Sequence, residues 1–174
     1  AGVRGGSSSA IGAALRIGGL GGLLLALPVA AGAQQMLLSD FEDGTSQGWF
    51  ARGGTSVVLT EAAASGVYSL RTTDRTASWM GPGRWVTDLL EKDTAYEFSA
   101  AVRLLPGQAA TTLKLTMDRL PVGDTDKYDQ VTPMTDVTDG AWVTLRGTYT
   151  YSSDVESLML YVEAAAVDAA FYLD

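Results

Sequence analysis

The sequence SLMLYVE, residues 157–163, has the alternation of a half-buried β-strand. Successive side chains of a strand point to opposite faces, so the three aliphatic residues at positions 158, 160 and 162 are predicted to share a core face. Tyr161 and Glu163 then lie with Met159 on the other face. An aromatic ring beside a hydrogen-bond acceptor on a rigid strand is what a sugar-binding surface needs, whereas an ordinary solvated strand face explains the same pattern without a ligand.

The same period of two recurs along the chain from residue 34. In 111–120, for example, aliphatic residues alternate with Lys114, Thr116 and Asp118, which are predicted to share a solvent-exposed (wet) face. Runs of this kind are separated by turn residues such as Gly, Asp and Pro. Eleven strands and no helix are predicted, with the strands at 36–41, 49–52, 56–60, 68–73, 84–90, 96–105, 111–120, 127–135, 141–151, 157–163 and 169–174. The pattern indicates an all-β sandwich.

The composition excludes several kinds of chemistry. The 174 residues include no cysteine and no histidine. A disulfide framework, a thiolate or imidazole metal site, and a Ser-His-Asp or Cys-His relay are therefore all impossible. Only carboxylates, hydroxyls, lysine and arginine remain as candidate catalytic groups.

The charge balance excludes two classes of partner. Twenty acidic residues against 12 basic ones give a formal net charge of -8. Such an acidic surface repels nucleic acid and anionic lipid. A neutral, hydroxyl-rich partner is compatible with it.

Residues 1–33 are predicted to be a secretory signal peptide. Arg4 and Arg16 supply its positive charge, 17–29 is an apolar run, and Ala31-Gly32-Ala33 is a small-residue cleavage motif. A membrane anchor is the alternative, but the apolar run is shorter than the ~20 residues of a bilayer span.

We therefore expect a secreted, extracellular protein with no membrane attachment after signal removal, and one β-sandwich domain at 34–174. The first residue is not methionine, which indicates a start inside a longer reading frame.

Catalysis is one interpretation of the acidic residues. Glycoside hydrolysis needs two carboxylates about 5–9.5 Å apart across a cleft. Glu163 is the acid predicted to stand on a wet strand face beside an aromatic ring, and it has no evident partner in the sequence. Asp118 and Asp129 also fall within predicted strands, so a pairing with one of them stays open at this point.

Binding is the other interpretation. In 127–131, alternation places Tyr128 and Gln130 on the face opposite Val131, which repeats the pairing of an aromatic ring with a polar tip. Trp79 lies in a polar, turn-rich segment where a core tryptophan is less expected. Arg52 can direct a fork of donors onto the same wet face. Rings stack on the C–H faces of sugars and these polar groups pair with hydroxyls, so together they predict a carbohydrate platform.

The chain also resembles a known family, the xylan-binding carbohydrate-binding modules of family 22, commonly found beside family 10 xylanase domains. The resemblance spans 41–174. It rests on nine motifs in order, namely Phe41-Glu42-Asp43-Gly44, Gly48-Trp49, Arg52-Gly53-Gly54, Ser65-Gly66-x-Tyr68-Ser69-Leu70, Trp79-x-Gly81-Pro82, Tyr128-x-Gln130-Val131, Trp142-Val143-x-Leu145-x-Gly147-x-Tyr149, Leu160-Tyr161-Val162-Glu163 and Phe171-Tyr172-Leu173-Asp174. Met80 departs from the pattern, because relatives often carry a polar residue there.

The resemblance implies a jelly roll whose concave sheet binds a β-1,4-linked xylose chain, and whether mixed-linkage β-glucan is a second ligand stays open at this point. It implies stacking by Trp79 and Tyr128, and polar contacts from Arg52, Tyr161 and Glu163. It also implies one structural calcium near the first and last strands, where Glu42 and Asp174 match; carboxylate oxygens suit that ion. A monomer is expected. A xylanase catalytic domain is expected to follow, because the chain stops at or near its last strand.

Three functions are therefore carried forward. The leading one is non-catalytic binding of xylan, which directs an attached secreted xylanase to plant cell-wall polysaccharide. The second is a small jelly-roll glycoside hydrolase that acts through Glu163 and an unidentified second acid. The third is a stabilising domain that keeps the fold without binding sugar.

Overall fold

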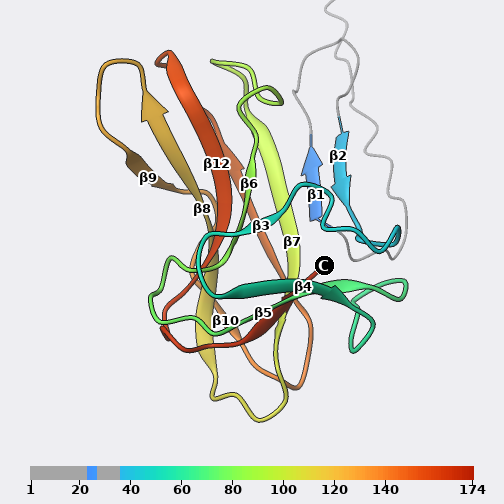
Figure 1. The fold of residues 1–174 in the computed structure, drawn as a ribbon. Helices are drawn as coiled ribbons and strands as arrows, with labels where there is room; N and C mark the ends of the chain where they lie inside the picture. The colour runs from blue at the N-terminus through green and yellow to red at the C-terminus, as the bar shows by residue number, and fades with distance from the viewer. Residues whose placement is uncertain (1–22, 27–35) are drawn as a thin grey trace, which may run out of the picture.

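The computed structural model describes residues 23–26 and 36–174 (Figure 1). These residues form strands and no helix, and so contain no helix that could cross a bilayer. The strands are β1 (Leu23–Ala26), β2 (Met36–Ser39), β3 (Phe50–Ala51), β4 (Thr55–Leu59), β5 (Ser69–Thr73), β6 (Pro82–Trp85), β7 (Tyr96–Leu104), β8 (Thr111–Pro121), β9 (Lys127–Gln130), β10 (Thr135–Val137), β11 (Val143–Tyr149), β12 (Val155–Ala164) and β13 (Phe171–Leu173). The predicted all-β sandwich of jelly-roll type is confirmed.

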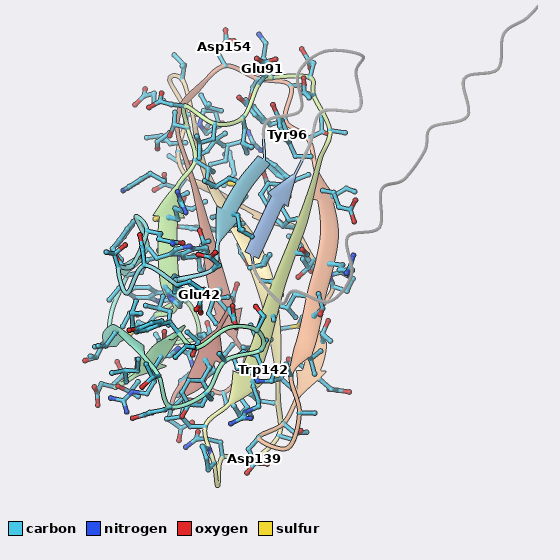
Figure 2. All side chains as sticks on the ribbon, turned by 90° about the vertical axis from the view of Figure 1, so that its right-hand side faces the viewer. Glu42, Glu91, Tyr96, Asp139, Trp142 and Asp154 are labelled. Carbon is cyan, nitrogen blue, oxygen red and sulfur yellow. The ribbon has the colours of Figure 1, made fainter. Side chains whose placement is uncertain are left out.

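The strands form two antiparallel sheets. The seven-stranded sheet has the order β2-β1-β7-β13-β5-β4, with β11 also pairing with β7. The six-stranded sheet has the order β10-β8-β12-β6-β3, with β9 also pairing with β8. Its two longest strands, β8 and β12, lie side by side through most of their length (Figure 1). Turns lie at both ends of the sandwich, as the positions of Asp154 and Asp139 show (Figure 2).

The core lies between the two sheets. Leu158, Leu160 and Val162 of β12 are completely buried in it, as the alternation of this strand predicted. From the other sheet, Phe98 and Phe171 are equally buried. Burying each such side chain stabilises the fold by about 1.5–3 kcal/mol. Because the aliphatic side of β12 faces this core, Tyr161 and Glu163 are held on the opposite, outer face of the six-stranded sheet.

The strand boundaries differ from the prediction in two informative places. The predicted strand 127–135 is interrupted, because Val131 and Thr132 both donate their backbone N–H to the carbonyl of Leu115 and Pro133 has no N–H to continue the ladder. The predicted strand 84–90 ends at Trp85, where the chain turns.

One strand was not predicted at all. Residues Leu23–Ala26 form β1, which pairs with β2 and β7. This strand falls within the segment 1–33 that was predicted to be a signal peptide. The rest of that segment lies outside the described residues.

Candidate functional site

Cross-strand pairing arranges the outer face of the six-stranded sheet in rows. Residues that pair directly across neighbouring antiparallel strands project to the same side. The rows are Lys114 and Glu163; then Gln130, Thr116, Tyr161, Gly83 and Phe50; then Tyr128, Asp118, Met159 and Trp85. The sheet thus brings together residues from five strands that are far apart in the sequence.

An open groove of about 480 Å³ lies over these rows. Its volume is typical of a ligand-binding site. It is lined by Arg52, Ser78, Trp79, Lys114, Tyr128, Tyr161 and Glu163. The structure therefore brings together five of the six residues predicted to bind carbohydrate. The sixth, Gln130, is exposed and pairs with Thr116 on the same face, but it does not line the groove.

Two aromatic side chains of the groove are free to meet a ligand. Trp79 is 45% exposed and Tyr128 is 61% exposed. Large aromatic side chains usually bury most of their surface, so two such rings at one groove are a marked exception. Flat apolar faces of this kind suit the C–H faces of a sugar ring.

Tyr161 contributes differently, because Arg52 covers its ring. The centre of the Arg52 guanidinium lies 3.8 Å from the centroid of that ring, and Tyr161 is only 2% exposed. Burial is the main cause that raises the pKa of Tyr161, which keeps its hydroxyl neutral. Tyr161 can therefore offer a polar edge to the groove, but not a stacking face.

Arg52 is itself fixed by polar contacts. It donates from Nη2 to Oδ2 of Asp118 at 3.0 Å, and from Nη1 to the carbonyl oxygen of Trp79 at 3.4 Å. The Asp118 side chain is 14% exposed, and burial raises its pKa against the opposing effect of Arg52. The guanidinium is thus a preorganised part of the groove wall.

Glu163 has one occupied and one available oxygen. Its Oε2 accepts a hydrogen bond from the Thr116 hydroxyl at 3.0 Å and lies 3.2 Å from Nζ of Lys114. Within the described residues, no hydrogen bond reaches Oε1. Glu163 can therefore accept a hydrogen bond from a ligand hydroxyl while its carboxylate stays oriented.

The segment that carries Trp79 is held by a buried cation. Arg75 is 3% exposed and has no carboxylate partner within the described residues. Its guanidinium instead donates to six carbonyl oxygens, those of Ala77, Ser78, Met80, Ala164, Ala166 and Ala169. These carbonyls belong to the Trp79 segment, to the last residue of β12 and to the connection between β12 and β13. Arg75 thereby joins the two segments and fixes the base of the Trp79 side chain.

A glycine allows this segment to approach β12. A Cβ atom at Gly81 would lie 1.8 Å from the carbonyl oxygen of Val162. Only glycine therefore permits the backbone to pass so close to the strand that carries Glu163. The same approach is marked by the backbone hydrogen bond from Ala164 to Ser78.

The acids of the outer face do not form a hydrolytic pair. Glu163 pairs with Lys114, and Asp118 lies four residues further along β8, which is about 13 Å at ~3.3 Å per residue. Glycosidases hold their two carboxyl groups about 5–9.5 Å apart. Asp129 faces the other way, where it accepts hydrogen bonds from Arg119 and Tyr149.

Glu42 and Asp174 lie together at a different place, around the loop 64–68. Asp174 accepts hydrogen bonds at Oδ2 from the N–H groups of Ala64 and Ser65, and Glu42 accepts at Oε1 from those of Val67 and Tyr68. The other oxygen of Asp174, Oδ1, is buried without a hydrogen-bond partner in the described part of the chain. Burial raises the pKa of Asp174 to about 6, and the negative charge of Glu42 contributes.

A carbohydrate-binding domain model matches residues 34–169. The chain is 45% identical over 147 residues to endo-1,4-beta-xylanase C of Paenibacillus barcinonensis, which covers 83% of this chain and 13% of that protein. It is 33% identical over 138 residues to endo-1,4-beta-xylanase A of Thermoanaerobacterium saccharolyticum, which covers 78% of this chain and 12% of that protein. The chain thus spans a small part of the curated relatives that it matches.

Solved structures give the same result. The CBM22-1 xylan-binding domain of Paenibacillus barcinonensis Xyn10C superposes with a TM-score of 0.75 at 39% identity, covering 91% of this chain and 94% of that domain. The C-terminal family 22 carbohydrate-binding module of Clostridium thermocellum Xyn10B superposes with a TM-score of 0.70 at 28% identity, covering 76% of this chain and 84% of that module.

Proposed function

The chain belongs to the carbohydrate-binding domains, and among them to family 22, and from this membership we propose that it is a non-catalytic module that binds xylan. The observation that carries the proposal is the groove, in which the exposed rings of Trp79 and Tyr128 stand beside the available carboxylate oxygen of Glu163. Xylan is neutral and rich in hydroxyls, so the acidic surface of the chain does not repel it.

In this proposal the aromatic rings and the polar groups have separate roles. Trp79 and Tyr128 stack on the C–H faces of successive xylose units, which gives most of the binding energy. Glu163 accepts a hydrogen bond from a hydroxyl, and the edges of Arg52 and Tyr161 supply further polar contacts. Gln130 stands outside the groove lining and is proposed to reach a sugar at its margin.

Affinity electrophoresis in gels containing soluble xylan tests the function. The domain 34–174 is expected to migrate more slowly as the xylan concentration rises, and a gel containing mixed-linkage β-glucan tests the second ligand. Unchanged migration in xylan would contradict the proposal. Unchanged migration together with a higher stability of an attached enzyme would favour a stabilising domain. Release of reducing sugar by the purified domain would favour the hydrolase. Among the described residues that line the groove, Glu163 is the one carboxylate, so the groove offers no second acid for hydrolysis.

Replacing Glu163 by glutamine is expected to weaken xylan binding by about five- to tenfold, because a hydrogen bond to a charged acceptor is about 1 kcal/mol stronger than one to a neutral acceptor. Isothermal titration calorimetry measures the change. Glu97→Gln is the control, since Glu97 lies on β7 with a side chain that is 63% exposed. Equal affinities of the wild type and the Glu163 variant would exclude a hydrogen-bonding role for this carboxylate.

The relatives further support a role within a larger enzyme, because this chain covers only 13% and 12% of the two xylanases. We propose that residues 1–33 direct export, that the mature protein is extracellular and monomeric, and that a covalently attached xylanase domain follows this one. Cleavage after Ala33 would remove β1 and free the edge of β7 that β1 covers. Sequencing the N-terminus of the secreted protein tests this point, since Gln34 is the expected first residue.

We also propose that Glu42 and Asp174 hold a structural calcium ion. The unpartnered, buried Oδ1 of Asp174 supports this, because it needs a cation to offset its burial. Calcium prefers oxygen ligands of this kind. The described residues contain no cluster of three or more acidic side chains suited to a metal, so backbone carbonyls or water would complete the coordination.

Calcium is expected to raise the Tm of the domain by roughly 5–10 °C at a concentration about 100 times its Kd, since it binds the folded state. Differential scanning calorimetry with calcium and with a chelator measures the effect. Asp174→Asn is expected to remove the dependence on calcium, whereas Asp154→Asn, at an exposed site beside Lys92, should keep it. Equal Tm values with calcium and with chelator would rule out the ion.

A further inference from the structure

A third exposed aromatic side chain lies on the outer face, beyond the groove. Trp85 is 55% exposed and ends β6. It pairs directly with Met159, so its indole projects to the same side as Met159 and Tyr161. Its strand neighbour Arg84 pairs with Leu160 and donates to the Ser39 hydroxyl on the opposite side. Trp85 does not line the groove, and nothing in the described chain buries its outer surface.

The ring of Trp85 is held rather than free. Phe50 stacks against it with a centroid separation of 6.0 Å and an interplanar angle of 22°. Phe50 itself is half-buried on the neighbouring edge strand β3. An indole supported from one side by a stacked ring presents a fixed apolar surface, as a binding platform requires.

Trp85 and Tyr128 occupy the two ends of one row. The direct pairs Tyr128–Asp118, Asp118–Met159 and Met159–Trp85 cross the strands β9, β8, β12 and β6. Three strand spacings separate the two rings along this row, which is about 14 Å. A polymer that lies across the strands can therefore touch both rings, whereas an oligosaccharide too short to cross this separation can touch only one.

Between the groove and Trp85, no side chain of the described residues projects far from the outer face of the sheet. Met159 is 6% exposed, and Gly83 has no side chain. A Cβ atom at Gly83 would lie 3.0 Å from Cγ of Arg52 and 3.3 Å from the sulfur of Met159. The side chains of Arg52 and Met159 therefore pack over Gly83, between the groove and Trp85.

We propose that Trp85 is an additional sugar-stacking platform, supported by Phe50, that extends the groove across the sheet and makes the module prefer long xylan chains over short ones. This inference rests on the proposed function. It adds a specificity-determining residue, because the groove residues alone set the affinity for a short oligosaccharide and Trp85 contributes only when the chain is long enough to reach it.

Calorimetric titration of the 174-residue chain with xylotriose and xylohexaose tests the inference. For Trp85→Ala, the affinity for xylohexaose is expected to fall about five- to tenfold, whereas that for xylotriose stays within twofold of the wild type. Trp85→Tyr is expected to restore most of the lost affinity, because it keeps a ring at this position. Val57→Ala, at an exposed apolar residue of the other sheet, is the control and should change neither affinity.

Other outcomes would overturn the inference. Unchanged affinity of Trp85→Ala for xylohexaose would show that the ring does not meet the sugar. An equal loss for both ligands would indicate a structural effect on the groove. A wild-type dimer in sedimentation that Trp85→Ala dissociates would assign the ring to a protein contact. If the wild type binds neither xylohexaose nor soluble xylan, the proposed function itself fails, and the platform fails with it.

Discussion

Replacing Arg75 by leucine is expected to lower the free energy of unfolding by at least ~3 kcal/mol, because buried polar groups that lose their partner cost about 1–3 kcal/mol each. Six backbone carbonyls receive hydrogen bonds from this one guanidinium. Chemical denaturation measures the loss. Xylan affinity should fall as well, since the segment that carries Trp79 would lose its attachment to the β12–β13 connection.

Two further variants make this prediction specific. Arg75→Lys keeps the charge but has only three donors, so an intermediate loss of stability is expected. Arg146→Leu replaces an arginine whose side chain is 69% exposed and whose nearest carboxylate lies 3.9 Å away. This change should alter stability by no more than about 0.5 kcal/mol. If Arg75→Leu were as stable as Arg146→Leu, Arg75 would not be what holds the Trp79 segment to the β12–β13 connection.

Replacing Trp79 by alanine is expected to weaken xylan binding by about 1–3 kcal/mol, or roughly 5- to 150-fold, the usual range for a central aromatic residue of a binding site. The same range applies to Tyr128→Ala. Tyr128 is 61% exposed and Trp79 is 45% exposed, so each change should lower the free energy of unfolding by less than the loss of a fully buried ring would. Calorimetric titration with xylohexaose and a denaturation curve for each variant separate affinity from stability.

Conservative variants complete this test. Trp79→Phe and Tyr128→Phe keep a ring, and each should retain more affinity than the corresponding alanine variant. Val57→Ala again serves as the control on the other sheet. Full affinity of a folded Trp79→Ala protein would mean that xylan does not stack on this ring, and the proposed arrangement of the ligand would have to be abandoned.

Alternation along the strands accounts for much of what the sequence predicted correctly. In β12 it separated Leu158 and Leu160 from Tyr161 and Glu163, and the structure places the two sets on opposite faces of the sheet, although Tyr161 was predicted to be solvent-exposed and is only 2% exposed because Arg52 covers it. It also placed Lys114 on the wet face, although the sequence gave no reason to connect this lysine with Glu163. That connection depends on the register between β8 and β12, which is set by packing of the whole sandwich.

The contacts within the groove could not be predicted for the same reason. Arg52 was predicted to direct its donors to a ligand, and it lines the groove, but nothing in the sequence indicated that it also stacks on Tyr161 and binds Asp118, which lies 66 residues away. Arg75 was not singled out at all. Its partners are backbone carbonyls, and no side-chain pattern in the sequence marks a carbonyl as an acceptor. The exposure of Trp79, in contrast, agrees with its polar and turn-rich surroundings.

The ion pairs of the groove determine how strongly polysaccharide binding depends on salt concentration. Arg52 is neutralised by Asp118, and Lys114 by Glu163, so the groove presents little net charge. A neutral polymer that enters it displaces few counterions, and dissolved salt screens no attraction between the two. Retention on the polysaccharide should therefore be about the same in fresh water and in brine.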